Sequence, residues 1–82
     1  MELEKAFGDV LRELRRTRKL SQEALALEAG MERNYVSLIE LGKNSPSVRM
    51  LFKLCEALKT SPSAFLTSVE RRMADSAQKT PL

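Results

Sequence analysis

The chain has 82 residues and a net charge of +3, with 43% hydrophobic and 30% charged residues, so we expect a single globular domain. It has one cysteine and no histidine, which excludes an internal disulfide framework, a thiol-rich zinc site and histidine-based acid–base catalysis. No apolar run approaches the ~20 residues of a membrane span and no signal-peptide pattern begins the chain, so we expect a cytoplasmic protein.

The first predicted helix covers residues 3–18. Its apolar residues recur at spacings of three and four, as in an amphipathic helix: Leu3, Phe7, Val10, Leu11 and Leu14. Gly8 interrupts this run and costs about 1 kcal/mol relative to alanine, a cost that close packing against another segment would explain. The stretch "RELRRTRK", residues 12–19, carries five positive charges against one glutamate. It is either a solvated helix face or part of a field that attracts DNA.

Two short helices separated by a glycine follow. Ser21 is a good N-cap for the first of them, because its hydroxyl can accept a hydrogen bond from a free backbone N–H. Gly30 suits the left-handed conformation that ends this helix. The next helix is predicted over residues 32–41, with Val36 and Ile39 directed inward.

The spacing within this pair of helices predicts a helix-turn-helix. Ala26 provides the small residue that two steeply crossing helices need at their contact. One side of the second helix is then left facing outward, and it consists of Arg33, Asn34, Ser37 and part of Leu38. Such a helix fits the major groove of B-DNA, where arginine can pair with guanine and asparagine with adenine.

The rest of the chain predicts two further helices. "KNSPS", residues 43–47, has the composition of a loop, and its last serine can cap a helix over residues 48–58. That helix has an apolar stripe of Val48, Leu51, Phe52, Cys55 and Leu58. Ser61 and Pro62 mark the start of the last helix, which carries Phe65, Leu66, Val69 and Met73. We therefore expect an all-α bundle of five helices over residues 1–75 and a flexible tail over residues 76–82.

The stretch "LRELRRTRKLSQEALALEAGMERNYVSLIELGKNSPSVRMLFKLCEAL" resembles the Cro and phage-repressor type of helix-turn-helix, the Xre family of transcriptional regulators. The resemblance covers residues 7–66 and implies the lambda-repressor-like fold. "ERNYVS" is also similar to the recognition helix of restriction–modification controller proteins, although these commonly carry arginine in the loop where this chain has "LGKNSPS". Lys19 stands where the family usually has glycine, so this turn must accommodate a side chain near left-handed geometry or end differently.

The resemblance implies a set of DNA contacts and one structural ion pair. Gln22 is expected to contact a phosphate, and Arg33, Asn34 and Ser37 are expected to contact base edges. Tyr35, together with Lys43 or Asn44, is expected to contact the DNA backbone. Arg15 and Glu40 are expected to form a partly buried ion pair between the first and third helices. Leu38 occupies a position that is often polar and base-reading in relatives; it either contacts a thymine methyl group or fills the core.

Apolar residues on the last two helices exceed what a small core requires. A surplus of this kind favours self-association, and we expect a homodimer interface made of Met50, Leu54, Phe65, Val69 and Met73. A two-fold dimer would place two recognition helices ~34 Å apart on a palindromic operator. The alternative is that these side chains only complete the core of a monomer.

These observations predict a sequence-specific DNA-binding transcriptional regulator with double-stranded DNA as its partner. The alternative function is a protein-interaction module such as an antitoxin or adaptor, because one fold supports several functions. We expect no enzymatic activity, since the sequence has no nucleophile motif, metal cluster or glycine-rich phosphate loop. We also expect no cofactor, metal or small-molecule ligand.

Overall fold

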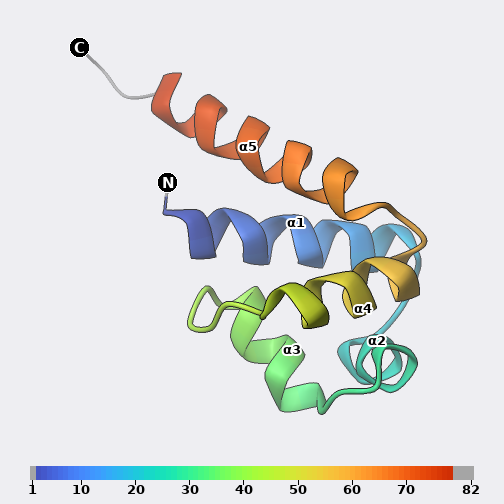
Figure 1. Ribbon diagram of the computed structural model, residues 1–82. Helices are drawn as coiled ribbons and strands as arrows, with labels where there is room; N and C mark the ends of the chain where they lie inside the picture. Colours follow the sequence, from blue (N-terminus) through green and yellow to red (C-terminus); the bar gives the residue numbers. More distant parts are fainter. Residues whose placement is uncertain (1, 79–82) are drawn as a thin grey trace.

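The computed structural model describes residues 2–78, with side chains described for residues 2–75. The described chain consists of five α-helices: α1 (Leu3–Thr17), α2 (Gln22–Ala29), α3 (Arg33–Glu40), α4 (Val48–Leu58) and α5 (Pro62–Gln78). The predicted all-α bundle is therefore confirmed. Figure 1 shows α5 running along one side of α1, while α2, α3 and α4 gather on the other side.

The last helix extends into the stretch that we expected to form the tail. α5 continues past residue 75, where we expected the domain to end, and the remainder of the expected tail, residues 79–82, lies outside the described residues. Over residues 2–78, no helix is both long enough and apolar enough to cross a membrane.

The helix starts follow the serine pattern of the sequence. Three serine hydroxyls accept a hydrogen bond from the backbone N–H three residues later, at 3.0, 3.2 and 3.1 Å: Ser21, Ser47 and Ser61. Each hydroxyl satisfies one of the N–H groups that a helix leaves unpaired at its start. Because α2, α4 and α5 begin directly after these residues, the caps fix where the chain changes direction.

Two lysines end helices in the left-handed conformation. Lys19 and Lys59 both have φ of 58°, a region that disfavours side chains with a Cβ. Lys19 therefore adopts the geometry for which the family usually uses glycine. Lys59 is the C-cap of α4, and its N–H bonds back to the helix. Backbone strain is thus placed at the turns that follow α1 and α4.

Replacing Lys59 with glycine is expected to stabilise the protein by about 0.5–1 kcal/mol, because glycine removes the left-handed strain and loses only part of that gain to unfolded-state entropy. Lys53→Gly is the matched control in a regular turn of α4, where glycine should destabilise by about 1 kcal/mol. Urea unfolding of both variants measures the two changes. A lower midpoint for Lys59→Gly would contradict the strain argument.

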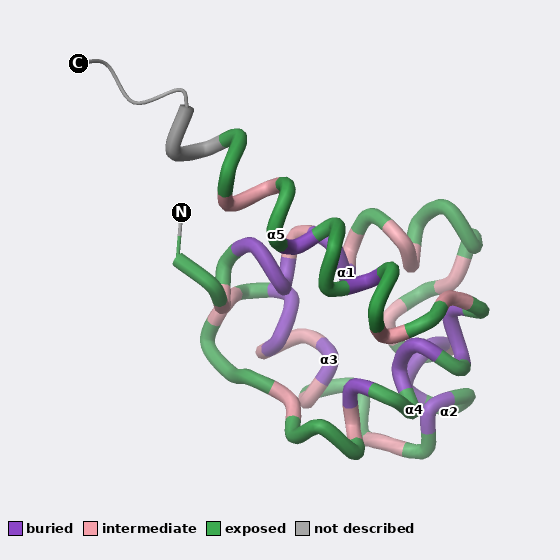
Figure 2. The backbone as a smooth tube through the Cα atoms, turned by 45° about the horizontal axis from the view of Figure 1, so that its top comes forward, coloured by how far each residue is buried: buried purple, intermediate pink, exposed green. Residues whose placement is uncertain are grey.

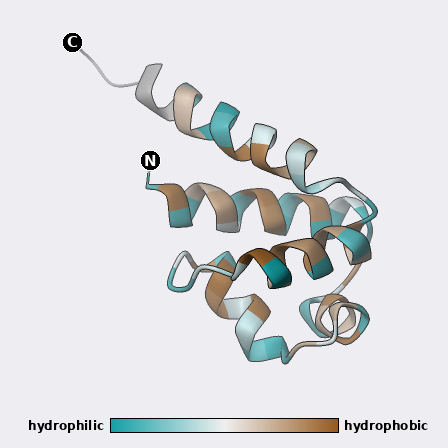
Figure 3. Ribbon diagram, in the orientation of Figure 1, coloured by the Kyte–Doolittle hydropathy of each residue, from teal (hydrophilic) through white to brown (hydrophobic). Residues whose placement is uncertain are grey.

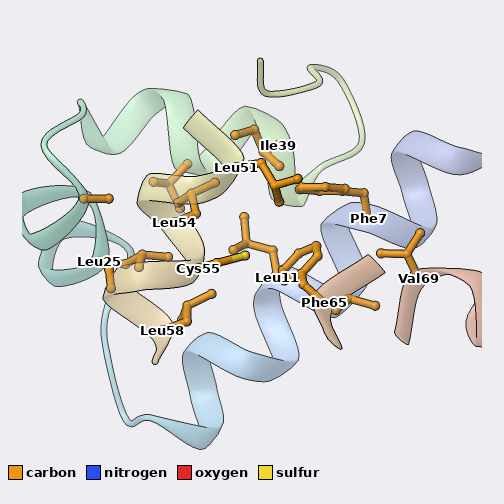
Figure 4. Packing of buried hydrophobic residues seen from close by; sticks show 14 of the residues in the cluster. Phe7, Leu11, Leu25, Ile39, Leu51, Leu54, Cys55, Leu58, Phe65 and Val69 are labelled. Carbon is orange, nitrogen blue, oxygen red and sulfur yellow. The ribbon is translucent and has the colours of Figure 1, made fainter. Parts of the chain in front are cut away.

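The hydrophobic core lies between α1 and the other four helices. Figure 4 shows Phe7 and Leu11 of α1 meeting side chains from α3, α4 and α5. The ring centroids of Phe7 and Phe65 lie 4.7 Å apart, so α5 packs directly against α1. Cys55 is buried in this core, and burial raises the pKa of its thiol to about 11. Cys55 is therefore a buried apolar residue, as its position in the sequence pattern predicted.

Part of the predicted dimer interface is wrong. Leu54, Phe65 and Val69 are buried in the core of the chain itself, so they cannot present a surface to a second molecule. The reason is that α5 lies across α1 and α4 and uses one of its faces to complete the core. Met73 is half-buried and packs against this core, and Met50 is also half-buried.

The exposed apolar side chains of this half of the molecule are different ones. Val48 and Phe52 were expected in the core stripe of α4, but they are 72% and 57% exposed. Leu66 of α5 is 41% exposed. Figure 2 shows that α5 is exposed along much of its length, with buried positions where it faces the bundle. The outer side of α4 therefore carries two apolar residues one helical turn apart.

Candidate nucleic-acid interface

α2 and α3 form a tightly packed pair joined by a short turn. Gly30 has φ of 71° and ψ of 41° and ends α2, and the next N–H, that of Met31, donates to the Ala26 carbonyl at 2.9 Å. This is the C-terminal geometry for which glycine is favoured. On α3, Val36 and Ile39 are completely buried. The predicted helix-turn-helix is present, and one side of α3 is fixed by the core.

The predicted base-reading residues lie on the other side of α3. Arg33 and Asn34 are exposed in its first turn, and Ser37 is half-buried on the following turn. Figure 3 shows that the end of α3 next to the α2–α3 turn is hydrophilic. Tyr35 is half-buried against the core, and Leu38 is half-buried. The structure thus brings Arg33, Asn34 and Ser37 onto one helix side.

The loop after α3 carries the two residues that we predict to contact the DNA backbone. Lys43 and Asn44 are both exposed. The N–H of Lys43 donates to the Leu38 carbonyl at 3.0 Å, which ties the start of the loop to α3. The Asn44 side-chain oxygen accepts from the Ser45 N–H at 3.0 Å, which leaves its amide nitrogen available to an acceptor.

Leu41 extends the outward side of α3 and was missed in the sequence analysis. It is 52% exposed and forms the C-cap of the helix with right-handed backbone angles. It follows Asn34 by seven residues, close to two helical turns, and therefore lies on the same side. This spacing was the signal in the sequence that could have identified it.

Glu40 is the centre of a buried polar network. It is 1% exposed at the C-terminal end of α3. Arg15 donates to both of its carboxylate oxygens, with Nε–Oε2 at 2.6 Å and Nη2–Oε1 at 3.0 Å, so the expected ion pair is present and bidentate. Gln22 Nε2 donates to Oε1 at 3.1 Å. The network therefore ties α1, α2 and α3 together.

The network determines the ionisation of Glu40. Burial is the largest influence on this carboxyl group and by itself raises its pKa. The hydrogen bonds from Arg15 and Gln22, together with the nearby guanidinium charges, outweigh burial and lower the pKa of Glu40 below its ordinary value. The hydrogen bond to Glu40 also raises the pKa of Arg15, despite its burial. Both groups are charged at neutral pH.

Gln22 is half-buried, and its amide nitrogen donates to Glu40 Oε1 at 3.1 Å, an inward contact that we did not expect. The sequence pattern did not reveal this, because the partner is eighteen residues away and on another helix. The phosphate contact of Gln22 stays a prediction.

The basic run of α1 divides into two groups. Arg12 and Arg15 are committed to Glu40, whereas Arg16, Arg18 and Lys19 are exposed. Only the second group is exposed enough to form a solvated face or a positive field, and its attraction of DNA stays a prediction. In the part of the chain that the structure describes, no cluster of three His, Cys, Asp or Glu side chains is placed to hold a metal ion.

Comparison with known proteins agrees with this geometry. The helix-turn-helix family model matches residues 11–65. The chain is 31% identical over 70 residues to y4dJ of Sinorhizobium fredii, an uncharacterized HTH-type transcriptional regulator, in a match that covers 85% of this chain and 91% of that relative.

Solved structures show the same arrangement of helices. The restriction–modification controller protein C.AhdI from Aeromonas hydrophila is 40% identical with a TM-score of 0.74, and the match covers 76% of this chain and 94% of that one. The clp gene regulator ClgR from Corynebacterium glutamicum is 28% identical with a TM-score of 0.91, and the match covers 96% of this chain and 84% of that one.

Proposed function

Because this chain belongs to the helix-turn-helix family of transcriptional regulators, we propose that it reads specific sequences of duplex DNA with α3 in the major groove. One observation carries the proposal: Arg33 and Asn34 are exposed on the first turn of a helix whose opposite side is locked in the core. Arginine can donate two hydrogen bonds to guanine O6 and N7, and asparagine can pair with adenine N6 and N7. The recognition helix is therefore rigidly held and carries the two side chains best suited to base edges.

The surrounding residues provide contacts of a second kind. Lys43 and Asn44 lie on the loop at the far end of α3, and Tyr35 extends from the helix at the edge of the core. We assign these side chains to DNA phosphates, which set the register of the helix but carry no sequence information. Ser37, next to the base-reading pair, has a hydroxyl that can donate to or accept from a base edge. Leu38 is assigned to a thymine methyl group.

Arg33 and Lys43 should have separable effects on DNA binding. Arg33→Ala is expected to weaken binding to the preferred site by about 10- to 100-fold and non-specific binding much less, because it removes a bidentate base contact. Lys43→Ala should weaken all sequences alike and lower the slope of log K against log salt by about one. Titration of a preferred and a scrambled duplex at several salt concentrations measures both effects. Equal weakening of both duplexes by Arg33→Ala would contradict base reading by α3.

We further propose that the chain acts as a homodimer on a palindromic site. The exposed apolar side chains of the C-terminal half, Val48 and Phe52 of α4 and Leu66 of α5, support this assignment. They replace the buried residues that the sequence suggested. One eight-residue helix contacts few base pairs, and a two-fold axis doubles the site that is read.

Phe52→Glu is expected to convert the dimer to a monomer without loss of folding, because this side chain is 57% exposed within one chain. Leu27→Glu is the matched control, since Leu27 is an exposed apolar residue on α2 and is not one of the side chains assigned to the interface. Sedimentation velocity at micromolar concentration should show a dimer for the wild type and the Leu27 variant and a monomer for the Phe52 variant. If the wild type sedimented as a monomer both with and without DNA, the proposed homodimer would be wrong.

A further inference from the structure

α1 holds the C-terminal end of the recognition helix at three adjacent points. Gly8 lets the two backbones touch, since a Cβ there would lie 2.8 Å from the Glu40 carbonyl oxygen and closer still to that of Ile39. One turn later, Arg12 Nη2 donates to the same Glu40 carbonyl at 3.1 Å. Arg15 follows and binds the Glu40 carboxylate. These residues repeat every three or four positions and form one stripe on α1.

The Arg12 contact satisfies a group that α3 cannot satisfy itself. Glu40 is the last residue of the helix, so its carbonyl belongs to the four that have no N–H partner within the helix. Arg12 also places its Nε 3.5 Å from the Glu40 carboxylate, so one guanidinium contacts both the main chain and the side chain of this residue. A positive group at a helix C-terminus is favourable for the helix dipole as well.

A carboxylate from the same helix orients the Arg12 side chain. Asp9 Oδ1 lies 4.0 Å from Arg12 Nη1, and Asp9 is itself contacted by Lys5 at 3.7 Å and by Arg72 of α5 at 3.8 Å. Arg12 is therefore flanked by a negative charge on one side and by Glu40 on the other, and its side chain is only 32% exposed. This is the environment of an arginine held in one direction, whereas a free surface charge would be solvated on most sides.

We infer that Arg12 is a positioning residue for base recognition: by holding the Glu40 carbonyl it fixes the orientation of α3, so that Arg33 and Asn34 meet the base edges in register. The inference rests on the proposed function. α3 has eight residues and is about 12 Å long, and the core holds it at Val36 and Ile39. These contacts lie nearer to Glu40 than to Arg33, so a tilt about them moves the first turn further than it moves the Glu40 end.

The competing role for Arg12 is attraction of phosphates, as one more charge in the basic run of α1. The two roles differ in what they require of the side chain. Attraction of phosphates requires only a positive charge, which lysine retains. Positioning requires the planar fork that reaches the carbonyl and the carboxylate together, which lysine lacks. Arg16 is the matched control because it is an exposed arginine on the same helix.

The test compares Arg12→Lys, Arg12→Met and Arg16→Met on the duplex selected by the wild type and on a scrambled duplex. Circular dichroism first establishes the temperature at which each variant is fully folded, and titrations are made below it at several salt concentrations. The readouts are the ratio of specific to non-specific affinity and the salt slope. A residue that only stabilises the fold would change neither in fully folded protein.

Both Arg12 variants are expected to lower the affinity ratio about tenfold, which corresponds to misalignment of one bidentate base contact, and to leave the salt slope unchanged. Arg16→Met should leave the ratio unchanged. If Arg12→Lys kept the affinity ratio of the wild type, the inference would be overturned. If the wild type itself bound the selected and scrambled duplexes with equal affinity, the proposed function would be wrong. Should both Arg12 variants fail to fold, Asp9→Asn provides the test: it is expected to lower the ratio about threefold, and an unchanged ratio would overturn the inference.

Discussion

Gly8→Ala is expected to lower the free energy of unfolding by about 3–4 kcal/mol, one of the largest effects of any single substitution in this chain. The added methyl group would overlap the backbone carbonyls of Ile39 and Glu40, and backbone atoms cannot rotate away as a side chain can. α1 and α3 would have to separate, which would also break the Glu40 network. In a helix without this contact the same change would stabilise by up to about 1 kcal/mol.

Gly30→Ala is the matched control for Gly8→Ala. Nothing lies within 4 Å of a Cβ at Gly30, but its φ of 71° disfavours alanine. We expect a loss of about 1–2 kcal/mol from backbone strain alone. Urea unfolding at pH 7 measures both variants. If Gly8→Ala were as stable as the wild type, the close approach of α1 to the end of α3 would be wrong.

Arg15→Met is expected to lower the free energy of unfolding by about 3–5 kcal/mol, because it leaves the Glu40 carboxylate buried without its main partner. Arg72→Met is the control. Arg72 is 30% exposed and pairs with the more exposed Glu13 and, at 3.8 Å, with Asp9, and pairs that keep this contact with solvent contribute about 1 kcal/mol. Thermal and urea unfolding should therefore show a much larger loss of stability for Arg15→Met than for Arg72→Met. Similar losses would show that the buried network does not hold the three helices together.

The same carboxylate gives stability a defined pH dependence. The pKa of Glu40 is lower in the folded state than in the unfolded chain, so its stabilising contribution is complete above the unfolded pKa of about 4.3 and is lost as pH falls through the folded pKa. The difference in stability between the wild type and Arg15→Met should therefore be largest near neutral pH and shrink on acidification, because protonation of Glu40 removes the ion pair of the wild type and the uncompensated buried charge of the variant. A difference that grows on acidification would contradict the lowered pKa.

The sequence predicted the helices and their caps because these are local properties. Serine hydroxyls reach N–H groups three residues away, and Gly30 adopts its positive φ within a single turn. The side of α3 that carries Arg33 and Asn34 also follows from helix periodicity. The Arg15–Glu40 pair joins residues far apart in the chain, and only the resemblance to a known family implied it.

Burial on the last two helices could not be predicted in the same way. Periodicity identifies the apolar side of a helix, but it does not show how many neighbouring helices cover that side. α5 turns back along α1 and buries Phe65 and Val69, while the outer side of α4 stays open and leaves Phe52 in solvent. The inward hydrogen bond of Gln22 and the carbonyl contact of Arg12 likewise depend on how α1 and α2 meet the end of α3.

Selection of bound duplexes from a random DNA pool tests most directly whether the exposed side of α3 reads bases. The wild type should enrich a palindromic consensus whose half-sites lie about one helical turn, ~34 Å, apart. Arg33→Ala should enrich a consensus that has lost its preference at one position in each half-site. A pool that shows no enriched sequence after selection, although the folded protein binds DNA, would contradict this account.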